Sequence, residues 1–425
     1  MKKHAKSKRR WQLVRRKREK RRPKPRRRKS QRAGRYPKRV AVPNAKNKRK
    51  ARRPHESPKL KIPQIFSFID NPIETLQTIK KLETLVVPAS VKELRIDHSS
   101  CKKLDLCASA VMDVTLLQAQ NRRRGNQLDL RGVYSDDVDV NMMLRGSGIL
   151  KQIAHPDSIL PKAIEVTIRT CDLFSGKASR IERSRKCDEA ATKLTDYFNK
   201  CLRMEKFELS RSGKFRLSSL ITEVIGNAEE HGGHWYTIAY FHQSEDELGH
   251  CHIALFNFGR TISESLLEGA ASEELRSRID SLIEKHNERG FLRSLLHPTW
   301  EEEALVTLFA LQEGVSRLSF TKKGIDRGNG TVNMIEFFNQ LAGGSQRMCL
   351  ISGKTYILFD GKFDLKKKVF DNGEERRVIA FNRTNSLEEP PDRDHVRTLP
   401  LGFPGTIISI RFDLDRSNLE KLAKR

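Results

Sequence analysis

The positive charge of this chain is concentrated in its first 61 residues. The 425-residue sequence has a formal net charge of +29, and 30 of its 82 Lys and Arg residues lie at positions 1–61, opposed there only by Glu19 and Glu56. The rest of the sequence is close to neutral. Because like charges repel and this segment has almost no apolar periodicity, we expect residues 1–61 to form a disordered basic tail. The folded core must then come from the residues that follow.

The composition of this tail also predicts a partner. A dense polycation condenses on nucleic-acid phosphates and releases counterions, so its affinity falls steeply with salt. Trp11 and Tyr36 are the only aromatic residues of the tail, which leaves little base stacking. We expect contact with RNA or DNA without sequence preference, while a solubilising arm, a nuclear-import signal or adsorption to an anionic membrane surface stay open as alternatives. The candidate contact residues are Arg15, Arg16, Lys17, Arg18, Arg26, Arg27, Arg28 and Lys29.

Cysteine usage and hydropathy indicate the compartment. The seven cysteines are an odd number without a C-x-x-C pair, so neither a disulfide framework nor a zinc site is indicated. No stretch approaches the roughly 18 apolar residues of a membrane span, and no apolar segment follows the N-terminal charges as in a secretory signal. We expect a soluble cytoplasmic protein, nuclear in a eukaryotic host, without a membrane partner.

Residues 62–165 have the pattern of a small α/β domain. Strand-like alternation at 91–97 and at 127–130 is followed in each case by a helical pattern, at 104–117 and 138–145. The arrangement resembles STAS domains, the fold of anti-sigma-factor antagonists, which carry a regulatory Ser or Thr after an Asp. Here the sequence is Asp105-Leu106-Cys107. We therefore expect a structural or partner-docking role for this STAS-like domain rather than a phosphorylation switch.

The segment 217–233 carries the strongest functional signal. Its apolar residues recur at helical spacing and define one buried stripe. Glu223, Asn227 and His231 stand four residues apart on a second stripe, where they project together. Mg²⁺ accepts few protein oxygens and keeps its other positions for water or phosphate, so one carboxamide oxygen suits it. A carboxylate one turn earlier suits activation of an attacking water.

Three further elements follow in order. A strand-like run at 252–256 leads into Asn257-Phe258-Gly259. The turn Arg327-Gly328-Asn329-Gly330 precedes a helical pattern, and such a helix start offers backbone N–H groups and a positive dipole end to phosphates. Gly405-Thr406 opens a strand at 405–412.

Together these four elements resemble the GHKL superfamily, whose Bergerat-type ATP-binding domain occurs in sensor histidine kinases, anti-sigma kinases, MutL and the gyrase B subunit. The resemblance implies an α/β (α+β) chain with a Bergerat-type α/β sandwich at 180–415 after the STAS-like domain. It also implies ATP and Mg²⁺ as cofactors. Thr261 stands where the family has its second glycine.

The resemblance assigns the site residues as follows. Glu223 is the catalytic residue, and Asn227 binds Mg²⁺. His231 contacts phosphate or caps its helix. Asn257 replaces the family's adenine-binding Asp and still offers a carbonyl acceptor to the adenine amino group. The remaining nucleotide-binding residues are Gly259, Arg327, Gly328, Gly330 and Thr406.

The long segment between residues 259 and 328 is where the family has its ATP lid. Helical patterns at 272–296 and 300–312 predict extra helices there, and Arg317, Lys322 and Lys323 are candidate phosphate contacts. No histidine lies between His155 and His231, which disfavours a self-phosphorylating histidine kinase. We expect an ATP-dependent conformational switch, with slow hydrolysis or none, that reports to a protein partner or to tail-bound nucleic acid.

Two rival functions stay open at this point. One is a Ser/Thr protein kinase of anti-sigma-kinase type that acts in trans. The other is a nucleic-acid-binding scaffold whose nucleotide pocket has decayed, which Asn257 and Thr261 permit. The oligomeric state is also open, a homodimer included.

Overall fold

The structure is a computed structural model of a mixed α/β protein. It describes residues 57–88, 90–123, 128–148, 168–170, 173–177, 183–204, 206–243, 249–269, 273–293, 301–315, 332–337, 346–369, 373–414 and 420. Residues Glu56–Arg425 form one compact unit, distinct from Met1–His55. The predicted nucleic-acid contacts in the tail lie outside the described residues. One boundary needs correction, because residues 59–61, which the sequence places in the tail, form a strand with Leu60 completely buried.

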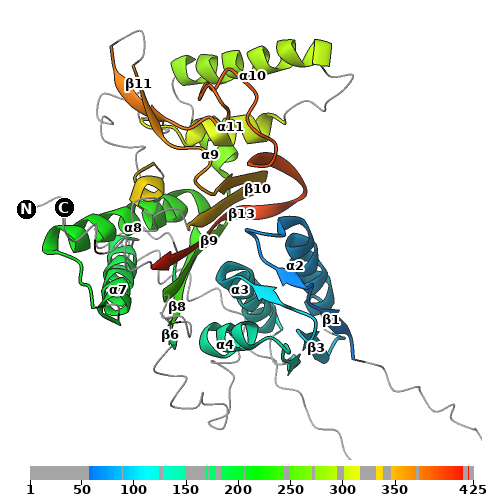
Figure 1. The fold of residues 1–425 in the computed structure, drawn as a ribbon. Coiled ribbons are helices and arrows are strands. Elements are labelled where there is room, and N and C mark those ends of the chain that lie inside the picture. Colours follow the sequence, from blue (N-terminus) through cyan, green and yellow to red (C-terminus); the bar gives the residue numbers. More distant parts are fainter. Residues whose placement is uncertain are drawn as a thin grey trace, which may run out of the picture. The chain divides into compact units, whose positions relative to one another are not determined.

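The first part of this unit is a small parallel α/β layer (Figure 1). Its three-stranded sheet has the order β1-β3-β5, and β2 pairs with β4. The strands are β1 (Lys59–Lys61), β2 (Ile65–Phe66), β3 (Glu93–Asp97), β4 (Lys103–Leu104) and β5 (Asp129–Val133). The helices are α2 (Pro72–Val86), α3 (Leu106–Arg122) and α4 (Val138–Ser147). The strands and helices expected at 91–97, 104–117, 127–130 and 138–145 are thus present, whereas α2 is an additional helix.

Asp105 determines where α3 begins. Its buried carboxylate accepts hydrogen bonds from the backbone N–H of Ala108 at 2.7 Å and of Phe68 at 2.5 Å. It thereby caps the helix and fixes the preceding loop. Leu106 and Cys107, which the sequence resemblance aligns with the phosphorylation site of STAS domains, are 1% and 0% exposed. These two side chains are therefore packing residues.

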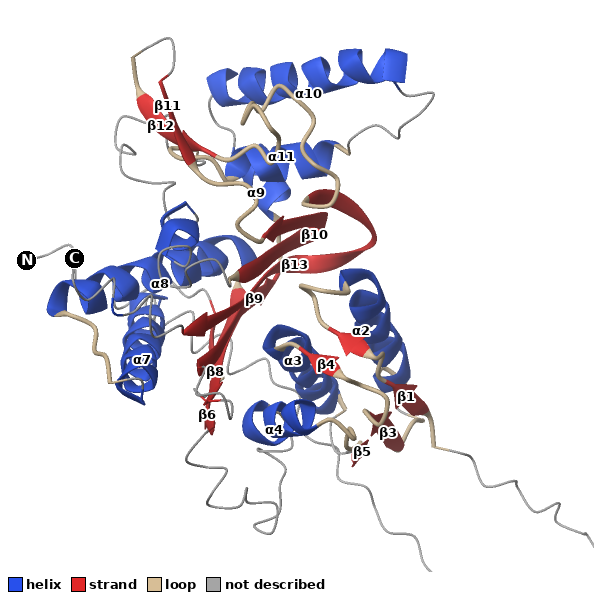
Figure 2. Ribbon diagram, in the orientation of Figure 1, coloured by secondary structure: helices blue, strands red, loops and turns tan. Residues whose placement is uncertain are grey.

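The larger sheet is antiparallel and has the strand order β10-β13-β9-β8-β6, with β7 also paired to β8 (Figure 2). The strands are β6 (Ile168–Thr170), β7 (Phe174–Lys177), β8 (His234–Gln243), β9 (Gly249–Phe258), β10 (Arg347–Phe359) and β13 (Val396–Leu414). β9 and β13 contain the strands expected at 252–256 and 405–412. Because β6 and β7 belong to this sheet, it begins before residue 180, which corrects the start of the second predicted domain.

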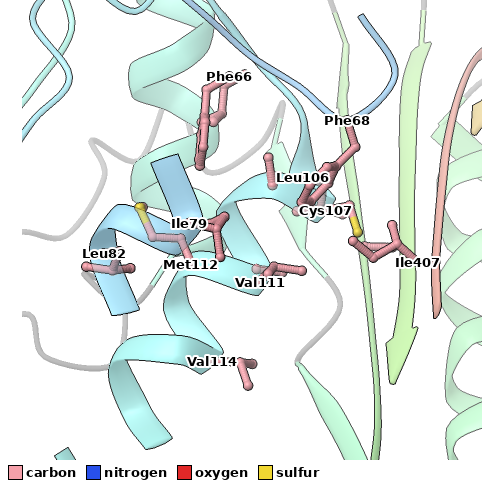
Figure 3. Packing of buried hydrophobic residues seen from close by; sticks show 14 of the residues in the cluster. Phe66, Phe68, Ile79, Leu82, Leu106, Cys107, Val111, Met112, Val114 and Ile407 are labelled. Carbon is pink, nitrogen blue, oxygen red and sulfur yellow. The ribbon is translucent and has the colours of Figure 1, made fainter. Parts of the chain in front are cut away.

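Both faces of the large sheet are covered. Helices α7 (Arg183–Met204) and α8 (Arg211–Gly232) pack on one face, where their apolar residues share a core with alternate residues of β8, β9, β10 and β13. The opposite face packs against α2 and α3 of the first layer. Figure 3 shows Ile407 of β13 pointing toward Cys107 of α3, and both belong to one buried cluster. The two sequence regions thus share a hydrophobic core.

The remaining elements lie between β9 and β13 in the sequence. They are the helices α9 (Ile262–Gly269), α10 (Glu273–Arg293) and α11 (Glu302–Ala310) and the two-stranded pair β11 (Lys366–Val369) and β12 (Glu375–Val378). The helices expected at 272–296 and 300–312 correspond to α10 and α11. Residues 332–337 are helical as well. None of the described helices is long and apolar enough to cross a membrane.

Asp70 ties the first layer to the large sheet by polar contacts. Its carboxylate accepts a hydrogen bond from Nη1 of Arg411, on β13, at 3.0 Å and lies 2.9 Å from Nζ of Lys103. The hydroxyl of Ser67 donates a third bond at 2.9 Å. Burial by itself raises the pKa of Asp70, but the hydrogen bonds from Arg411, Lys103 and Ser67 outweigh it and lower the pKa to about 2.

This network predicts a pH-dependent contribution to stability. The folded pKa of Asp70 lies below its ordinary value of 3.8, so the stabilisation is complete above about pH 4 and is lost as the pH falls toward 2. We expect Asp70→Asn to lower the free energy of unfolding by about 2 kcal/mol at pH 7 and to flatten its dependence on pH between 2 and 4. Urea unfolding at several pH values measures both effects.

Glu83→Gln is the matched control for this experiment. Glu83 pairs with Lys80 on the exposed surface of α2, and such a pair contributes little to stability. An unchanged acid profile in the Asp70 variant would contradict the assignment of this network.

Candidate functional site

Helix α8 presents the candidate magnesium and catalytic residues. Ser210 caps its start by accepting a hydrogen bond from the backbone N–H of Gly213 at 3.1 Å, and Gly233, with φ of 81°, follows its end. Glu223 is half-buried and Asn227 is exposed one turn later. The side chain of His231 lies outside the described residues. The predicted apolar stripe is confirmed by its buried members, which are Leu217, Leu220, Ile221, Val224 and Ile225.

The two predicted adenine-binding side chains lie opposite each other. Asn257 near the end of β9 and Thr406 on β13 are cross-strand partners, so their side chains project from the same face of the sheet. Asn257 is 3% exposed, and its carboxamide forms no hydrogen bond with any described residue. The carboxamide therefore has hydrogen-bonding capacity that no described residue uses.

The face that carries Asn257 and Thr406 is the face that α8 covers. Strand residues alternate between faces, and Ile253 and Leu255, which share the face of Asn257, belong to the core that contains Ile221 and Ile225 of α8. The structure therefore brings three of the predicted elements to one side of the sheet. They are the helix with Glu223 and Asn227, the end of β9, and the part of β13 where Thr406 pairs with β9.

Gly405 allows β13 to approach β9 closely at this point. Its φ is 144°, and a Cβ built on it would lie 2.0 Å from the carbonyl oxygen of Asn257. Across the same junction, the backbone N–H of Gly259 donates to the carbonyl of Pro404 at 3.1 Å. The glycines at 259 and 405 thus hold the two strand ends together around Asn257.

Thr261, which stands where the sequence resemblance expects a glycine, has a structural role in the observed turn. Its hydroxyl accepts a hydrogen bond from the backbone N–H of Glu264 at 3.1 Å, and the Glu264 carboxylate accepts one from the backbone N–H of Thr261 at 2.8 Å. This reciprocal pair is a capping box. Thr261 therefore starts helix α9 directly after the Asn257–Gly259 turn.

Ser352 is a site residue that the sequence reasoning missed. It lies on β10 beside Thr406, and the two hydroxyl oxygens are 3.1 Å apart. Its oxygen also accepts a hydrogen bond from the backbone N–H of Ile262, in the first turn of α9, at 2.8 Å. The only signal in the sequence is a small polar residue after an apolar run, which is also common where a strand ends.

A β-bulge follows Ser352 and is fixed by Glu303 of α11. The carboxylate of Glu303 accepts hydrogen bonds from the backbone N–H of Lys354, with both oxygens at 3.3 Å. It occupies the space where a Cβ of Gly353 would lie, and Gly353 has φ of 57°. Burial raises the pKa of Glu303, and the neighbouring Glu264 and Glu301 raise it further.

The predicted phosphate contacts are not placed. Arg327, Gly328 and Gly330, together with Arg317, Lys322 and Lys323, lie outside the described residues. Within the described part of the chain, no group of three or more His, Cys, Asp or Glu side chains is arranged to hold a metal ion. The sequence resemblance assigns Mg²⁺ to the oxygen of Asn227, with its other positions left for water or phosphate oxygens.

Comparison with known proteins adds no family to this picture. No protein-family model, no curated protein and no solved structure matches the chain. The candidate site consequently rests on the pairing of Asn257 with Thr406, on the burial of Asn257 and on the face that α8 covers.

Two glycines near the site should respond oppositely to substitution. Gly405→Ala places a Cβ against backbone atoms at a positive φ, so we expect a loss of about 3 kcal/mol or more in the free energy of unfolding. Gly226 lies inside α8, and a Cβ there meets nothing within 4 Å. Gly226→Ala should therefore stabilise the protein by about 0.5–1 kcal/mol. Thermal unfolding of both variants tests the close approach, and a neutral Gly405→Ala would contradict it.

Proposed function

We propose that the chain is a Mg-ATP-binding protein of the GHKL type, with a Bergerat-type nucleotide site between α8 and the large sheet. The observation that carries the proposal is the Asn257–Thr406 pair, in which the side chain of a buried Asn, without a hydrogen-bond partner among the described residues, lies opposite a hydroxyl on the face covered by α8. The order of the four motifs along the sequence supports it. The first layer is, on the same proposal, a STAS-like domain that serves as a structural cover of the sheet.

The residue types fit the parts of the ligand. The carboxamide oxygen of Asn257 accepts a hydrogen bond from the adenine amino group, and Thr406 supplies a hydroxyl beside it. Asn227 holds Mg²⁺, which would neutralise phosphate charge when bound. Glu223, one turn before Asn227, orients or deprotonates a water molecule. This last role makes slow hydrolysis a property of the same site.

We assign the function of this site to conformational switching. Helix α9 begins at the end of the Asn257–Gly259 turn, and its first turn is bonded to Ser352 beside Thr406. Helix α11 packs against both α9 and β10. A nucleotide that contacts Asn257 and Thr406 therefore acts on elements that lead directly into the helices of the predicted lid. If ATP bound one arrangement of these helices more tightly than another, it would shift the protein toward that arrangement and so act as a switch.

Isothermal titration with Mg-ATP tests the site. Asn257→Ala should weaken ATP binding about tenfold or more, because it removes the acceptor for the amino group. Asn227→Ala should weaken binding of Mg-ATP while leaving the weaker, Mg²⁺-free binding of ATP unchanged. Glu223→Ala is the matched control on the same helix, since it should bind ATP as the parent protein does while losing any turnover. Parent-like affinity in both asparagine variants would rule out this site.

We further propose that residues 1–55 bind nucleic acid through their positive charge. The support is the density of Lys and Arg in the sequence, together with a compact unit that begins at Glu56 and carries the candidate site. Contact through phosphates predicts a strong dependence on salt and little dependence on sequence.

Deletion of residues 1–55 should abolish retention of RNA in a filter-binding assay. The deletion stops before β1, so the folded unit stays intact. For the full-length chain, the affinity should fall by roughly 10³-fold or more between 50 and 200 mM salt, as expected for six or more neutralised phosphates. Equal retention of RNA by the full-length and shortened chains would end this proposal, whether or not ATP binds.

A further inference from the structure

Ser352 lies at the junction of three elements of the candidate site. Its side chain is 0% exposed. Its hydroxyl oxygen accepts a hydrogen bond from the backbone N–H of Ile262 at 2.8 Å and lies 3.1 Å from the hydroxyl oxygen of Thr406. These are its only two hydrogen-bond partners among the described residues. The backbone N–H is a donor only, so the first of these bonds has a fixed direction.

The direction of the second bond follows from the burial of Ser352. If Thr406 donated to Ser352, the hydroxyl proton of the fully buried Ser352 would have no acceptor among the described residues, and a buried unsatisfied donor costs about 1–3 kcal/mol. Ser352 therefore donates to Thr406. The hydroxyl of Thr406, which is only partly buried, keeps its own proton for a ligand.

This direction gives the site a defined pattern of donors and acceptors. Thr406 presents a hydroxyl proton, and Asn257, which on the proposed function turns its carboxamide oxygen toward the base, presents an acceptor opposite it. The complementary ligand edge has a ring nitrogen acceptor next to an exocyclic amino donor. Adenine has this edge at its N1 and its 6-amino group, whereas guanine carries a proton at N1 and a carbonyl at position 6.

We infer that Ser352 is a positioning residue that directs the hydroxyl proton of Thr406 toward N1 of a bound adenine. The inference rests on the proposed function and extends it, because it names the residue that sets the selectivity for the base. The chain of bonds runs from the backbone N–H of Ile262 through Ser352 to Thr406, and each bond polarises the next. The start of α9 is thereby linked to recognition of the base.

The test compares two nucleotides that differ at one atom. The full-length protein is titrated, with Mg²⁺ present, with ATP and with 1-deaza-ATP, in which a C–H group replaces N1. The parent protein should prefer ATP by about tenfold, the value of one hydrogen bond. Ser352→Ala should reduce this preference to about threefold or less by weakening ATP binding alone. A merely structural role would weaken both nucleotides equally and leave the ratio unchanged.

Ser409→Ala is the matched control. Ser409 is 2% exposed and lies on β13, the strand of Thr406. It projects from the opposite face of the sheet, so the variant should keep the parent's preference. If Ser352→Ala does not fold, Ser352→Cys replaces it, since a thiol is a weak donor of similar size and should also lower the ratio.

The outcomes separate the two proposals. If the parent protein prefers ATP and the ratio is unchanged in a folded Ser352 variant, the role of Ser352 is overturned while ATP binding stands. If the parent protein binds ATP and 1-deaza-ATP equally, the direction of the Thr406 proton is wrong. If it binds neither nucleotide, the proposed function fails and the inference fails with it.

Discussion

The fold depends on burying both faces of one antiparallel sheet. Antiparallel sheets commonly expose one face to water and alternate apolar with polar residues. In β9, by contrast, residues 251–257 are all buried. The first layer and the pair α7–α8 each remove one face from water, and burial of apolar area on this scale is the main favourable contribution to folding. The first layer is therefore a part of the core, and Asp70 adds a polar contact at its edge.

Burial on both faces also explains why the polar residues of the sheet are informative. His252 points to the first layer, where burial and the nearby Arg411 lower its pKa to about 3, so it stays neutral and acts as a packing residue. Ser352 has both of its hydrogen bonds satisfied. Asn257 differs from both because it is 3% exposed and its carboxamide has no hydrogen-bond partner among the described residues. The cross-strand position of Asn257 opposite Thr406, on the face that α8 covers, locates the candidate site.

Much of the local structure is predictable from the sequence. The errors concern short strands, which are assigned only by their pairing with strands far away in the sequence. The periodicity of α8, α10 and α11 and the alternation in β3 and β13 indicate these elements without further information. The strands β6 and β7 are short and lie beside a poorly patterned segment, so only their pairing with β8 assigns them to the large sheet. β1 follows a strongly basic run, and its assignment to the tail is wrong because Leu60 finds its partners more than thirty residues away on β3.

The sequence by itself determined the separation of charge, the helix that carries Glu223 and Asn227, and the residue types of the proposed nucleotide site. These are local properties, set by composition and by spacing along a single element. Only the tertiary structure decided that Asn257 lies opposite Thr406 and that Thr261 caps helix α9. It also decided that Ser352 lies beside Thr406 on the next strand of the sheet. Strand register and cross-strand contacts join residues that are 50 to 150 positions apart. No periodicity within one element encodes them, because they are fixed only when the sheet closes and both of its faces are packed.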